Sequence, residues 1–401
     1  MTIGDDQSAE NPPAPDSSPS ELSARIETEA MAKPDVIIDK ENSFSPPGSI
    51  LSSPPEQRIP EDSRLDGPFV RPGIGVSLLW TLLLLFFQIG VGIAVVVVSI
   101  IVVIASGPIP AAQVGDQAQK LMMPWLLPVA AFSTVLLSMV IVLIAFRGQF
   151  ARCMGMRSMT ALQAVMVAML SVPMAVLTSE FTNCISHIFP NMPMMEMFKD
   201  FASQPLIAIF IFGCLCPGFG EELYFRGFLS RGLVSHHRVL YGSLFAALLF
   251  GAIHIHPIQG SGAFMLGLIL QYVFLITRSF WAPVILHTAN NSMAFLAMLY
   301  GHLFPIRGFT SSSGEGIEHS SFVLVGIAFT TAASLLFALY QTRSDWLRPD
   351  GTRWTRDFVT AEGPVERDIQ LVSRQIDLRT LCGVVVIYAV FVATLYFSVE
   401  V

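Results

Sequence analysis

The stretch Leu206–Arg226 reads LIAIFIFGCLCPGFGEELYFR, and it contains the feature that decides the fold. Residues 206–216 are apolar, and Pro217 then leads to two adjacent acids, Glu221 and Glu222. A charge at the centre of a bilayer costs about 3 kcal/mol or more, so acids inside membrane segments are rare and usually functional. The stretch therefore predicts a membrane helix that carries a functional site.

The composition of the whole chain agrees with a membrane protein. Of its 401 residues, 53% are hydrophobic and only 13% are charged, whereas ordinary soluble proteins are about 25% charged. A membrane-spanning helix needs about 20 apolar residues. Nine apolar segments are candidates: 74–106, 121–146, 159–178, 204–229, 239–255, 262–277, 281–300, 321–341 and 380–399. Because the fifth and sixth are short, we expect an all-α, polytopic transmembrane bundle of eight or nine spans.

Two hydrophilic parts lie outside these segments. Residues 1–72 are rich in Pro and Ser and hold 14 acidic residues against 6 basic ones. Such a composition is typical of disorder, so we predict a disordered, acidic cytoplasmic tail. The second part, 342–379, carries mixed charges and two tryptophans, and we expect it to be a surface loop at the membrane interface.

The basic residues predict the orientation in the membrane, since cytoplasmic loops carry an excess of Lys and Arg. With the N-terminus inside, the outer loops contain only Lys120, Lys199 and Arg307. The inner loops contain Arg147, Arg152, Arg157, Arg231, Arg238, Arg278 and seven arginines between Arg343 and Arg379. We therefore expect a multi-pass protein of a bacterial inner membrane with a cytoplasmic N-terminus. No basic footprint for nucleic acid is present, so the bilayer is the expected partner.

The glutamate pair predicts a division of roles. Glu222 and Arg226 are four residues apart and share one helix face, so they can pair. Glu221 lies about 100° round the helix and has no such partner, so it is the candidate general base. Pro217 and its neighbouring glycines predict a break in the helix near the site. The simpler alternative is a structural ion pair, with the glycines present for close helix packing.

Two further segments carry polar groups within apolar helices. Phe250 and His254 are four residues apart, and so are His287 and Asn291. Either histidine alone could be a hydrogen-bonded core residue, and polar pairs also tie membrane helices together. Taken together, the groups supply the parts for hydrolysis of a peptide bond by water. Glu221 and His254 would position and deprotonate the water, while His287 and Asn291 would stabilise the oxyanion.

The three motifs, in this order, resemble those of the CPBP intramembrane proteases. They are Glu221-Glu222-x-x-x-Arg226, Phe250-x-x-x-His254 and His287-x-x-x-Asn291. That family includes type II CAAX prenyl endopeptidases and bacteriocin-processing or immunity relatives. The resemblance implies an intramembrane endopeptidase with Glu221 as the water-activating base, supported by Glu222 and Arg226. It covers roughly 204–300, the predicted catalytic core, between N-terminal helices in 73–203 and C-terminal helices in 301–401.

A metal is an open alternative at this site. Glu221, His254 and His287 could form a three-ligand zinc site with an open position. There is, however, no His-Glu-x-x-His helix, and one glutamate cannot easily be both ligand and base. We favour a glutamate-dependent enzyme and keep zinc or another divalent ion as the alternative.

Three functional classes follow from these features. The first is a protease that acts on a membrane-associated peptide or protein, with a prenylated CAAX-type substrate as one form. The second is a non-enzymatic membrane scaffold or a bacteriocin-immunity-like protein that uses the same fold. The third is a transporter, which the absence of a paired internal repeat disfavours.

Overall fold

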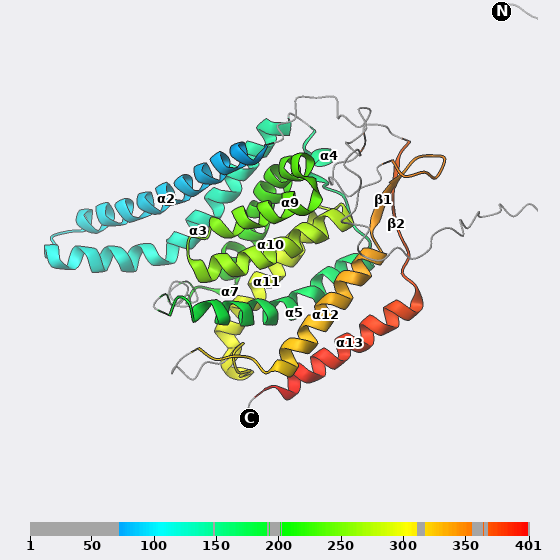
Figure 1. Cartoon of the computed structure of the whole chain (residues 1–401). Helices are drawn as coiled ribbons and strands as arrows, with labels where there is room; N and C mark the ends of the chain where they lie inside the picture. The colour runs from blue at the N-terminus through cyan, green and yellow to red at the C-terminus, as the bar shows by residue number, and fades with distance from the viewer. Residues whose placement is uncertain are drawn as a thin grey trace, which may run out of the picture. The chain divides into compact units, whose positions relative to one another are not determined.

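The computed structural model describes residues 72–146, 149–190, 192, 201, 203–310, 317–354, 364 and 368–399 of the chain. Within these residues the chain is almost entirely helical (Figure 1). The predicted disordered tail, 1–72, lies outside the described residues except for its last residue.

The described helices begin and end close to the predicted apolar segments. They are α2 (Ile74–Ala105), α3 (Ala111–Phe146), α4 (Phe150–Met154), α5 (Ala161–Ser186), α7 (Leu206–Ala208), η3 (Ile209–Leu215), α8 (Cys216–Glu222), η4 (Leu223–Leu229), α9 (Ser230–Ala252), α10 (Pro257–Thr277), α11 (Trp281–Tyr300), η5 (Gly301–Leu303), α12 (Phe322–Gln341) and α13 (Leu378–Phe397). Within the described part, seven helices are long and apolar enough to cross a membrane. The protein is therefore a multi-pass helical membrane protein, as predicted.

Two differences explain why seven helices qualify where eight or nine spans were expected. The segments predicted at 204–229 and 239–255 lie in one helical run, Leu206–Ala252. Helix α11 occupies the predicted residues 281–300 but is not among the seven, because His287, Asn290 and Asn291 lower its hydropathy. Every predicted apolar segment nevertheless overlaps a helix.

Lipid-facing surface is most evident on α2. Its exposed side chains are large and apolar, including Leu79, Phe86 and Ile104. Its few buried positions include two serines and a threonine, Ser77, Ser99 and Thr81. A helix in lipid is expected to place apolar groups outside and small polar groups where it contacts another helix. The reason is that close packing, and not the hydrophobic effect, joins helices within a bilayer.

The predicted broken helix is present, but the break is not at Pro217. The run Leu206–Ala252 bends at His237 and Arg238, whose φ angles are −126° and 66°. At Pro217 the chain stays helical, and it changes there from the π-helix η3 to α8. Pro217 has no N–H to donate, and the wider π-helical turn before it accommodates this loss without a bend.

Gly242 lets the two arms of the broken helix pack closely. A Cβ atom there would lie 2.5 Å from the Val234 Cα atom and 2.6 Å from the Leu233 carbonyl carbon. Because both contacts are backbone atoms, Gly242→Ala is expected to lower the free energy of unfolding by about 1–3 kcal/mol. Gly326→Ala is the matched control, since a Cβ at Gly326 meets nothing within 4 Å. Thermal unfolding of both variants in detergent micelles measures the difference, and equal melting temperatures would contradict the packing argument.

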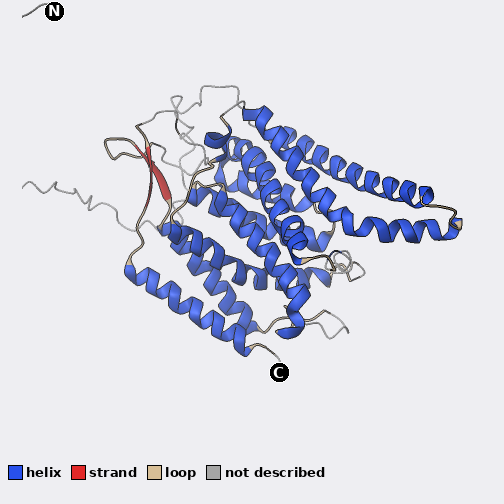
Figure 2. Cartoon of the chain, turned by 180° about the vertical axis from the view of Figure 1, so that it is seen from behind, coloured by secondary structure: helices blue, strands red, loops and turns tan. Residues whose placement is uncertain are grey.

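Two short strands form a small sheet beside the helix ends (Figure 2). Strand β1 (Ser344–Leu347) pairs antiparallel with β2 (Gln370–Ser373). The Nε2 atom of Gln163 on α5 donates to the Thr342 carbonyl at 2.6 Å, and Nε of Arg278 donates to the Ser344 carbonyl at 2.9 Å. The loop prediction for 342–379 missed these strands, which buried side chains of two helices hold against the bundle.

Candidate active site

The candidate residues lie on or next to α8, α9, α10 and α11 and the π-helix η4, which contact one another, and α9, α10 and α11 lie side by side in the bundle (Figure 1). Gly218 on α8 lies so close to α11 that a Cβ there would be 2.3 Å from the Thr288 Oγ1 atom and 3.0 Å from its backbone nitrogen. Gly220 approaches Val135 on α3 in the same way. These glycines therefore permit close helix packing, which was the alternative to the predicted bend.

Glu222 is at the centre of a buried network of charges. Its Oε1 atom accepts hydrogen bonds from Nη1 of Arg226 at 2.9 Å and from Nδ1 of His287 at 2.8 Å. The side chains of Glu222, Arg226 and His287 are 0%, 2% and 4% exposed. The predicted i,i+4 pair is present, and it gains a third member 65 residues further along the chain.

The orientation of His287 follows from this network. The Glu222 Oε1 atom already accepts from the Arg226 guanidinium, and a carboxylate paired with a guanidinium acts as an acceptor, so Nδ1 of His287 is the donor in the second hydrogen bond. The other ring nitrogen, Nε2, is turned toward Glu221 and lies 3.9 Å from its Oε2 atom. That separation is too long for a direct hydrogen bond and suits one bridging water.

Glu221 occupies the more open end of the site. Its side chain is 13% exposed, and its Oε2 atom is buried without a protein hydrogen-bond partner in the described part of the chain. Buried carboxylate oxygens are normally hydrogen-bonded to protein or water. Glu221 therefore offers an acceptor to a polar group that enters the site.

The ring of Phe250 organises the site, a role that the sequence prediction missed. The Arg226 guanidinium lies 4.5 Å from its centroid, in the geometry of a cation–π contact. The rings of His254 and His287 contact it edge-on at 5.3 and 5.7 Å. The i,i+4 spacing of Phe250 and His254 was visible in the sequence, but the position of the ring between Arg226 and His287 depends on tertiary packing.

His254 and Asn291 lie at the edges of this arrangement. The Nδ1 atom of His254 is 2.9 Å from the Phe250 carbonyl, which directs its Nε2 atom away from its own helix. The Asn291 amide donates to the Gly213 carbonyl at 3.5 Å, a weak hydrogen bond. His256, two residues beyond His254, instead caps the start of α10.

Zinc at Glu221, His254 and His287 stays a prediction. For a shared ion, one ligand atom from each of Glu221, His254 and His287 would have to lie close to the other two. The described residues whose ligand atoms all lie within 4.8 Å of one another belong to a different group. Nδ1 of His287 is held by Glu222, and Nε2 is the ring nitrogen that faces Glu221.

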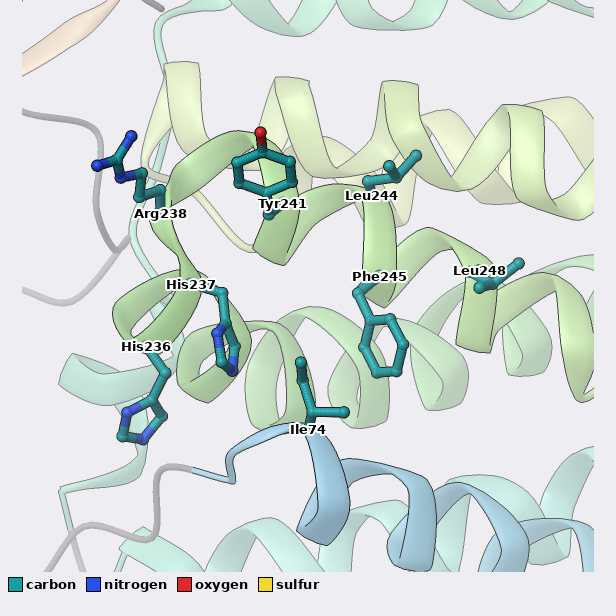
Figure 3. Close-up of a pocket in the computed structure, with 8 residues that line it drawn as sticks. All are labelled: Ile74, His236, His237, Arg238, Tyr241, Leu244, Phe245 and Leu248. Atoms are coloured by element: carbon teal, nitrogen blue, oxygen red, sulfur yellow. The ribbon is translucent and has the colours of Figure 1, made fainter.

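Two cavities in the described part of the chain are not lined by any of the six candidate residues. One has a volume of about 470 Å³ and lies at the break in the helix, between α9 and the start of α2 (Figure 3). His236, His237 and Arg238 form its polar end, and its other walls are largely apolar. The second, of about 320 Å³, is lined by residues on both sides of His254, among them Gly251 and His256.

Comparison with known families identifies the helical core. Residues 203–293 match the family model described as type II CAAX prenyl endopeptidase Rce1-like. This segment is an Rce1-like domain. The predicted relationship to the CPBP proteases is thereby confirmed, and the Rce1-like domain contains all six candidate residues. No significant match was found to a curated protein or to a solved structure.

Proposed function

We propose that the protein is an intramembrane endopeptidase that hydrolyses a peptide bond of a membrane-associated substrate. The observation that carries this proposal is the buried network of Arg226, Glu222 and His287 beside Glu221. In the described part of the chain, Oε2 of Glu221 and Oε2 of Glu222 are both buried without a protein partner, which a purely structural ion pair does not require. The Rce1-like domain supports the same activity.

Glu221 is the base in the proposed reaction, and His254 assists it. Glu221 takes a proton from a water molecule, and the water oxygen forms a bond to the carbonyl carbon of the substrate. The oxyanion that results accepts hydrogen bonds from the His287 ring, through Nε2, and from the Asn291 amide. The C–N bond then breaks, and the proton held by Glu221 passes to the leaving amine.

The charges in the site support this assignment. The Arg226 guanidinium pairs with Glu222, and the Nε2 side of the His287 ring faces Glu221. Glu222 also holds the His287 ring in place through Nδ1, so Nε2 needs no reorientation during the reaction. Asn291 has to release only a weak hydrogen bond to Gly213 before it can reach an oxyanion.

We also propose that the N-terminus of the protein lies in the cytoplasm. The first substrate to test is a peptide with a prenylated CAAX-type C-terminus. Purified protein in lipid vesicles is expected to cleave the prenylated peptide and to cleave the same peptide without the lipid much more slowly. Mass spectrometry of the products locates the bond. Equal rates for both peptides would exclude a prenylated substrate class, and no cleavage of any membrane-associated peptide would contradict the proposed function.

A further inference from the structure

A second cluster of reactive side chains lies away from the glutamate site, where α5 ends. Glu180 and Cys184 are on α5, four residues apart, and His319 lies in the segment that leads into α12. One ligand atom from each of the three lies within 4.8 Å of the other two. These residues have no part in the proposed proteolysis.

Hydrogen bonds fix the positions of the Glu180 and His319 side chains in this cluster. Nδ1 of His319 is 2.6 Å from Oε1 of Glu180, and the other Glu180 oxygen accepts from the Ser320 N–H group at 2.8 Å. Nε2 of His319 is 2.8 Å from Nε2 of His187, and the two rings stack with centroids 5.1 Å apart. The His319 ring is thus held by Glu180 of α5 and by His187, the residue that directly follows α5.

The donor set has the chemistry of a transition-metal site. A carboxylate, a thiolate and an imidazole are the three protein ligands that zinc uses, with bonds of about 2.0–2.3 Å. Thiolate and imidazole favour zinc over magnesium or calcium, which prefer oxygen ligands. Cys184 and the His319 side chain are exposed, so they can make the small adjustments that a common ion requires.

We propose that Glu180, Cys184 and His319 bind a divalent zinc-type ion. Binding displaces the proton shared by His319 and Glu180 and the thiol proton of Cys184, and both protons go to solvent. His187 supports the site through its contact with Nε2 of His319, as residues outside the ligand set commonly do. The ion would join the end of α5 to a segment 139 residues away, while a fourth position stays open to water.

The test uses cobalt(II) as a spectroscopic substitute for zinc on the full-length protein in detergent, after treatment with chelator. We expect a single equivalent to bind and to produce a thiolate-to-cobalt charge-transfer band. Cys184→Ser should abolish the band, and His319→Ala should weaken the affinity by about tenfold or more. Cys382→Ser is the matched control, because Cys382 is an exposed cysteine on α13, outside the cluster, and it should keep the band and the affinity.

Two results would overturn the proposal. One is a charge-transfer band that persists in Cys184→Ser, and the other is cobalt binding by wild type that is no tighter than binding by a Cys184→Ser/His319→Ala variant. Glu221→Gln separates this site from the glutamate site, since it should leave the cobalt spectrum unchanged. Loss of the spectrum in Glu221→Gln would instead place the ion at the proposed active site and refute the present assignment.

Discussion

Glu221→Gln is expected to lower the rate of peptide cleavage by about 10²–10⁴-fold, the usual contribution of a general base. Gln has nearly the same shape but cannot accept a proton from water. The largest neighbouring interaction, between Glu222 and Arg226, does not involve Glu221. The variant should therefore remain folded, and the loss should appear in kcat. The measurement is cleavage by purified protein in vesicles, together with a melting temperature for each variant.

Asp116→Asn provides the matched control for this prediction. Asp116 is an exposed acid on α3 that pairs with Lys120, so its neutralisation should leave the cleavage rate unchanged. His254→Ala should slow cleavage along with Glu221→Gln, since the two residues share one step in the proposal. If both variants retained full activity, the water-activation step would be wrong. If an inactive Glu221→Gln protein still performed its biological role, the alternative of a non-enzymatic membrane scaffold or immunity-like protein would gain support.

The part of the site that could be predicted from sequence depends on short-range helix geometry. Glu222 and Arg226 are four residues apart, and they form the expected ion pair. The length of the apolar segments correctly placed the long helices, because twenty consecutive apolar residues leave few other structures available in a bilayer. Residues such as His287 and Asn291 also drew attention by being polar inside an apolar helix.

The part that could not be predicted depends on contacts between distant segments. Nothing in the sequence indicates that Nδ1 of His287 bonds to Glu222. The hydrogen bond from Nη2 of Arg226 to the Gly267 carbonyl could not be predicted either. Every residue has a backbone carbonyl, so the sequence does not single out Gly267 as the acceptor. The break at His237 and Arg238 contains neither proline nor glycine. A sequence rule that looks for these residues therefore placed the break at Pro217, where a π-helical turn absorbs the missing hydrogen bond.

Arg226→Ala is expected to lower the free energy of unfolding by about 3–5 kcal/mol, because it leaves Glu222 as a buried charge without its cation. The guanidinium makes three interactions at once. It donates to Glu222 and to the Gly267 carbonyl, both at 2.9 Å, and it lies over the Phe250 ring. Unfolding of the detergent-solubilised protein by a graded denaturant provides the comparison with wild type.

Two further variants separate charge from packing in this prediction. Arg226→Lys keeps the positive charge but lacks the planar fork that reaches both acceptors, so its loss should be smaller than that of Arg226→Ala. Glu222→Gln combined with Arg226→Ala removes the stranded charge and should recover part of the stability, which a double-mutant cycle measures as a coupling energy. If Arg226→Ala were as stable as wild type, or the double variant no more stable than Arg226→Ala, the ion pair would not be what holds the site together.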